Sequence, residues 1–248
     1  MKPGFKIFIA IVVVIVLFIM TAPASLVTSV LPEENSPLSL SGFQGKALSG
    51  EAAQVTFKGI PIQNVQWDLN FLSTITGSPS ASLIINDPDL TMNADATFKS
   101  ENNWSMNELS GDIQLRKLEQ FIPGLRPLAL SGSASLRDIS VALAKTAYET
   151  GEGSIQWDNA SLRINNQALD LDSITAELGL DGTDLVLDYL GTSALAPKGR
   201  IKLSPAGAYE LTLNITPAAL PQNLQWLSRM GKPSPDGTVD IDFKGRLR

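Results

Sequence analysis

The sequence predicts a mainly β protein, because apolar and polar residues alternate with a period of two along most of the chain. The alternation is strict over residues 65–71, 209–215 and 239–243. Turn formers such as Asn165-Asn166 and Asp236-Gly237 separate such runs at intervals typical of all-β domains. Since strict alternation gives one buried and one solvated face, we expect a curved antiparallel sheet or an incompletely closed, barrel-like one.

The first element of the chain is an apolar stretch over residues 7–20 that contains no polar side chain. A membrane-spanning helix needs about 20 apolar residues, and some span with about 17. Lys2 and Lys6 precede the stretch, so the N-terminus is expected in the cytoplasm. We predict an anchor and exit helix over residues 1–32 and an extracytoplasmic β-rich domain over residues 33–248. Residues representative of the anchor are Ile7, Val12, Leu17 and Met20.

A cleaved signal peptide is the alternative reading of the same stretch. Ala22-Pro23-Ala24 has the small residues of a cleavage site. Against cleavage, apolar residues recur between Leu26 and Leu31, which indicates a second helical stretch beyond Pro23. Both readings predict that the chain is exported.

Two short segments depart from the strand pattern and predict helices, near residues 117–122 and 219–230. Pro123-Gly124 ends the first, whereas Pro221 lies in the first turn of the second and Gly231 ends it. A strand is expected after each helix.

Two motifs recur at one offset and suggest an internal repeat. Leu38–Gly42 resembles Leu128–Gly132, and Gln66-Trp67-Asp68 recurs as Gln156-Trp157-Asp158. Repeat halves would then cover about 38–127 and 128–248, each a small meander of strands. Short strands of similar composition also match by chance, so both interpretations stay open.

Composition excludes several classes of site. The 248 residues include no histidine and no cysteine, so there is no imidazole base, no thiol nucleophile and no zinc–thiolate site. The 25 acidic residues outnumber the 19 basic ones, which argues against nucleic acid as a partner. The carboxylate pairs Asp170/Asp172 and Asp240/Asp242 could bind calcium, but a solvated strand face explains them more simply. We expect no enzyme, no cofactor and no metal site.

The tryptophans and glycines divide into candidate binding and structural residues. Trp226 is out of phase with the neighbouring leucines, and Trp104 lies in a polar stretch, so both are candidate partner-binding residues. Trp67 and Trp157 lie on apolar strand faces and are expected in the core. The glycines expected at bends, turns or close approaches of the backbone are Gly42, Gly50, Gly237 and Gly245.

A set of weak motifs occurs in order along the whole chain. After the N-terminal span come Leu40-Ser41-Gly42, Gly50-Glu51-Ala52-Ala53 and Trp67-Asp68-Leu69, and the chain ends with Asp236-Gly237 and Phe243-Lys244-Gly245. In this order and spacing the chain resembles protein N of the bacterial type II secretion system, the GspN family. The resemblance implies a single-pass protein of the cell inner membrane with most of its mass in the periplasm and no catalytic residues.

The resemblance also implies a function. We expect a non-catalytic scaffold that contacts other inner-membrane or periplasmic components of the type II secretion system and supports export of folded proteins across the outer membrane. The alternative is a periplasmic half-barrel module whose concave face binds a lipid or another apolar ligand. An open sheet leaves edge strands to which a partner can add a strand.

Overall fold

The computed structural model describes residues 38–46, 48–57, 59–70, 72–73, 77–100, 102–121, 123–164, 167–192, 198–220, 222–229 and 231–246. The predicted anchor residues Ile7, Val12, Leu17 and Met20 lie outside these residues. Within the described residues, no helix has the length and apolar character needed to cross a membrane. The chain divides into two compact units, residues 1–97 and 98–248, whereas the predicted repeat halves would meet at residue 127; the repeat stays a prediction.

The first unit is an antiparallel meander in which each strand pairs with the next one along the chain. Its buried apolar residues come from β2 to β5 and are Ala52, Val55, Ile62, Val65, Ile85 and Ala94. The strands are β1 (Leu38–Gly45), β2 (Ser49–Phe57), β3 (Ile60–Asn70), β4 (Ser80–Asp87) and β5 (Leu90–Ser100), whose last residues belong to the second unit.

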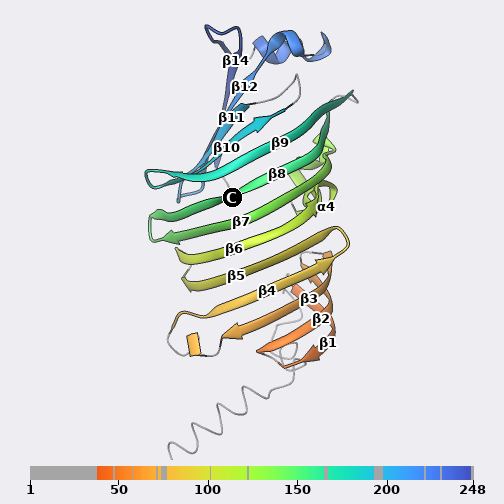
Figure 1. Ribbon diagram of the computed structural model, residues 1–248, viewed down its shortest axis with the longest axis vertical. Coiled ribbons are helices and arrows are strands. Elements are labelled where there is room, and N and C mark those ends of the chain that lie inside the picture. The colour runs from red at the N-terminus through yellow and green to blue at the C-terminus, as the bar shows by residue number, and fades with distance from the viewer. Residues whose placement is uncertain are drawn as a thin grey trace, which may run out of the picture. The chain divides into compact units, whose positions relative to one another are not determined.

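The second unit holds the longer strands, and Figure 1 shows β7, β8 and β9 running side by side in it. Its strand order follows the chain from β6 to β12 and ends β12-β14-β13, with antiparallel pairing. The elements are β6 (Asn103–Gln114), α4 (Leu115–Phe121), η1 (Pro123–Leu128), β7 (Ser131–Ala144), β8 (Ala147–Ile164), β9 (Gln167–Asp181), β10 (Asp184–Gly191), β11 (Lys198–Leu203), β12 (Ala208–Ile215), η2 (Pro217–Ala219), η3 (Gln222–Arg229), β13 (Lys232–Pro233) and β14 (Val239–Arg246).

The predicted mainly β, antiparallel fold is confirmed, and the described strands form open sheets. In neither unit do the first and last described strands pair with each other. The first predicted helix corresponds to α4. The second is divided into two 3-10 helices, η2 and η3, which flank Pro221. In one continuous helix from Pro217 to Arg229, position 221 would lie beyond the first turn, where an α-helix needs a backbone N–H that proline lacks.

Aromatic rings lie against glycines of the neighbouring strand at four places in the described sheets. The pairs are Trp67 with Gly50, Trp157 with Gly132, Tyr189 with Gly199, and Tyr209 with Gly245. A methyl group on any of these glycines would lie within 3.0 Å of an atom of its aromatic partner. The rings thus occupy the space that a side chain would otherwise fill, a known way of covering glycine in strands.

The two tryptophans expected in the core are half-buried in these pairs. Trp157 also donates a hydrogen bond from Nε1 to the carbonyl oxygen of Ser131 at 2.8 Å, which fixes the ring over β7. The other two glycines singled out by the sequence have left-handed backbones. Gly42 has a φ of 67° and faces Ala53, and Gly237 has a φ of 84° in the turn between β13 and β14.

Gly199→Ala should destabilise the second unit, because the new methyl would lie 2.0 Å from the carbonyl oxygen of Thr212 and 2.4 Å from the hydroxyl of Tyr189. We expect a loss of about 1–3 kcal/mol in the free energy of unfolding, measured in urea. Gly179→Ala, on β9, is the matched control, because its methyl would only reach ordinary contact with Val186 at 3.6 Å. Equal stability of the two variants would contradict this account.

Candidate functional site

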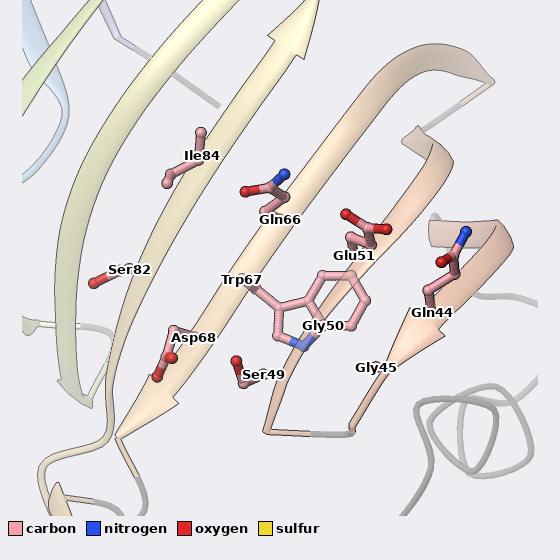
Figure 2. A pocket seen from close by; sticks show the side chains of 10 residues that line it. All are labelled: Gln44, Gly45, Ser49, Gly50, Glu51, Gln66, Trp67, Asp68, Ser82 and Ile84. Atoms are coloured by element: carbon pink, nitrogen blue, oxygen red, sulfur yellow. The ribbon is translucent and has the colours of Figure 1, made fainter.

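Both units contain hollows that could receive a ligand, and those of the two units differ chemically. The first unit has a pocket of about 540 Å³, seen in Figure 2, and a neighbouring one of about 350 Å³ that shares Gln44, Glu51 and Gln66 with it. The lining residues of the larger pocket are Gln44, Gly45, Ser49, Gly50, Glu51, Gln66, Trp67, Asp68, Ser82 and Ile84. The hollow in the second unit is a groove of about 340 Å³.

The larger pocket of the first unit is built around a row of cross-strand pairs. Gln44 on β1 is opposite Glu51 on β2, which is opposite Gln66 on β3. Figure 2 shows these three side chains in line across the strands. The lining offers amide and carboxylate groups for hydrogen bonding and includes no basic side chain to accompany its two carboxylates, Glu51 and Asp68.

The groove of the second unit is lined by aliphatic side chains alone. They come from six consecutive strands, β6 to β11, and belong to Leu109, Leu136, Ile139, Val141, Ile155, Leu178, Leu185, Val186, Leu187, Ile201 and Leu203. Several are only half-buried, so the groove is an uncovered part of the apolar face. We refer to this set as the aliphatic groove.

Gly151 on β8 lies close to leucine side chains of the two following strands. A methyl group there would lie 2.5 Å from Cδ1 of Leu185 on β10 and 2.9 Å from Cδ2 of Leu180 on β9. Leu185 therefore reaches across an intervening strand onto the backbone of β8. The missing side chain of a glycine leaves room for this close approach.

Two bulges bring further aliphatic residues to the groove. Leu136 and Ile139 both line it although they are three residues apart, because the register of β7 shifts near Asp138, which has a φ of 50°. A matching shift on β6 occurs near Glu108, whose φ is 52°.

Serine hydroxyls join these two bulges. The backbone N–H of Asp138 donates to the Ser110 hydroxyl at 3.1 Å, and that of Glu108 donates to the Ser140 hydroxyl at 3.2 Å. Backbone groups released by the bulges therefore keep hydrogen-bond partners.

Charged residues of the same strands lie on the face opposite the aliphatic groove. Arg200 on β11 donates two hydrogen bonds to Asp188 on β10, at 2.6 and 2.8 Å. Lys202 contacts Asp181 at 2.9 Å and Asp184 at 3.4 Å. The hydrogen bond from Lys202, together with its charge, lowers the pKa of Asp181. These groups are solvent-exposed, so each pair contributes little stability.

The carboxylates that the sequence offered as a calcium alternative are engaged in local hydrogen bonds. Asp240 accepts from Asn214 and Ser234, both at 2.7 Å, and Asp172 accepts from Thr192 at 3.1 Å. Within the described residues, no three acidic side chains gather as metal ligands would.

The two candidate partner-binding tryptophans lie outside these hollows. Trp226 on η3 is 44 % exposed, as its phase in the sequence predicted. Trp104 on β6 is half-buried, because it is paired across the strands with the buried Leu143. The groove residues were missed, although Ile155, Leu185 and Leu187 belong to alternating runs of the sequence, because nothing in those runs distinguishes them from other apolar strand residues.

Comparison with known proteins points to one family. The family described as "Type II secretion system (T2SS), protein N" matches residues 36–242. A protein from Aeromonas hydrophila named "Type II secretion system protein N" is 24 % identical over 236 residues, covering 91 % of each chain. A protein of the same name from Vibrio cholerae is 23 % identical over 232 residues, covering 89 % of this chain and 88 % of the relative. No solved structure matches significantly.

Tyr189 beside the aliphatic groove should give a stability transition at alkaline pH. Its hydroxyl donates to the carbonyl of Thr212 at 3.2 Å, and burial raises its pKa to about 12. An unfolded tyrosine titrates near pH 10. The stability that neutral Tyr189 contributes is therefore fully present below pH ~10 and is lost as the pH rises towards 12.

Urea unfolding at pH ~9 and ~11, which bracket the unfolded pKa, tests this expectation. The wild type should lose more stability between the two than Tyr189→Phe, which keeps the ring but cannot ionise. Equal losses would show that Tyr189 does not titrate in this window.

Proposed function

The chain belongs to the family of type II secretion system protein N, and from this premise we propose that it acts in type II secretion as a non-catalytic scaffold. The family match across residues 36–242 carries the proposal. The aliphatic groove offers no group for nucleophilic or acid–base chemistry, which fits a role in contact rather than in chemistry. In this role the protein holds other secretion components together and so supports export of folded proteins across the outer membrane.

We further propose that the scaffold is a single-pass protein of the inner membrane, with residues 33–248 in the periplasm. The support is the apolar stretch over residues 7–20 with Lys2 and Lys6 before it. Carbonate extraction of membranes should leave the full-length chain in the pellet. A shortened, soluble mature form starting near Ser25 would instead favour a cleaved signal peptide.

The edge of β1 is the strand surface that best suits a partner. Within the described part of the chain, β1 pairs with β2 alone, and its sequence from Leu38 to Gly45 contains no charge and no proline. Charges and prolines are the usual protections of an edge strand. The opposite edge is better protected, because β14 carries Lys244 and is partly covered by β13 with Pro233. A partner strand added at β1 would bind through main-chain hydrogen bonds.

A photo-crosslinking residue at Ser41 on β1 tests the scaffold role in intact membranes. We expect crosslinks to identified type II secretion components. The same residue at Glu177 is the control, because β9 is paired on both sides and its backbone is occupied. Absence of such crosslinks at Ser41, together with normal secretion after deletion of the gene, would overturn the proposal.

The other function left open by the sequence, binding of a lipid or another apolar ligand, is favoured by a separate observation. The aliphatic groove is an uncovered apolar surface on the second unit. Neither β1 nor Ser41 contributes to it, so the two functions are separable by mutation.

A further inference from the structure

We propose that the aliphatic groove binds one hydrocarbon chain, the acyl chain of a membrane lipid. The inference rests on the second of the two candidate functions and is independent of the scaffold role. Three properties of the groove define the occupant: its chemistry, its size and its charge.

The chemistry of the lining selects an occupant without hydrogen-bonding groups. All eleven lining residues are aliphatic. The strands that carry them pair with neighbours on both sides from β7 to β10, so their backbone N–H and C=O groups are already used in the sheet. An extended peptide lying in the groove would leave its own amides without partners, which is unfavourable. A hydrocarbon chain has no such groups.

The volume of the groove selects a single chain. A cavity of about 150 Å³ lined by aliphatic and aromatic side chains holds one benzene ring. The groove measures about 340 Å³, which scales to roughly a dozen carbon atoms. An α-helix is about 10–12 Å wide with its side chains, so a partner helix would lie over the groove and not within it.

The charge of the surroundings places the headgroup in solvent. The lining contains no cationic side chain that could hold a phosphate. The basic residues Arg200 and Lys202 of β11 lie on the opposite face and are already paired with aspartates. The acyl chain therefore supplies the recognition, and we expect little preference among headgroups.

Photo-labelling of the full chain in lipid vesicles tests the proposal. The chain is reconstituted in phosphatidylethanolamine vesicles that contain a trace of the same lipid with a diazirine on one acyl chain. After irradiation, peptide mass spectrometry should find label on groove peptides of β7 to β11. Label on the predicted anchor, residues 7–20, reports insertion in the same sample.

A groove-filling variant and a matched control make the experiment specific. Ile155→Trp places an indole in the groove and should lower groove labelling at least tenfold while anchor labelling persists. Leu190→Trp is the control, because Leu190 lies on β10 like Leu187 but is 49 % exposed and outside the groove. It should label like the wild type.

Circular dichroism and thermal melting of each variant verify folding, and Leu187→Asn replaces Ile155→Trp if the latter does not fold. An unlabelled groove in the wild type would overturn the proposal, as would equal groove labelling in wild type and folded groove variants. Neither result bears on the scaffold role, which the crosslinks at Ser41 test separately.

Discussion

The close approach between Leu185 on β10 and Gly151 on β8 brings two strands that are not paired with each other into contact on the apolar face of the second unit. An open sheet with one apolar face has to turn that face away from water, either against another layer or by bending upon itself. Gly151 lets a leucine from two strands away contact the backbone of β8, where a methyl group would lie 2.5 Å from Cδ1 of Leu185. This contact covers part of the face, and the aliphatic groove is a part that stays open.

The aromatic–glycine pairs serve the same requirement elsewhere in the sheets. A glycine in a strand allows neighbouring chains to come close but leaves apolar surface and backbone uncovered. At Gly199 the ring of Tyr189 fills that space, and its hydroxyl reaches the Thr212 carbonyl one strand further on. Three strands are therefore connected by one side chain. The raised pKa of Tyr189 follows from the same burial.

The alternation of the sequence predicted the strands and their apolar face, but it could not predict the groove. Periodicity gives the face of a residue only while the register is regular, and Leu136 and Ile139 share a face because the chain bulges near Asp138. Aspartate in a left-handed conformation leaves no periodic signal. The same holds for Gly151, which resembles any other strand glycine in the sequence. Only the structure shows that Leu185 of β10 lies against it. The second helix was predicted as one continuous element for a comparable reason. An apolar stripe shows which residues share a helix face, but it does not show where a residue such as Pro221, which has no backbone N–H, interrupts the hydrogen bonding.

The second unit separates its polar side chains from its apolar side chains on the two faces of the sheet. Arg200 and Asp188 are directly opposite each other on β11 and β10, and their ion pair on the solvated face favours this register of the two strands. No charged residue is therefore needed in the groove to align them. The groove can then remain free of polar groups, as a hydrocarbon ligand requires. The proposed scaffold contact at β1 would use backbone groups of the other unit. Because the two surfaces share no residue, a protein that binds a secretion partner through its edge strand can retain an acyl chain in its groove at the same time.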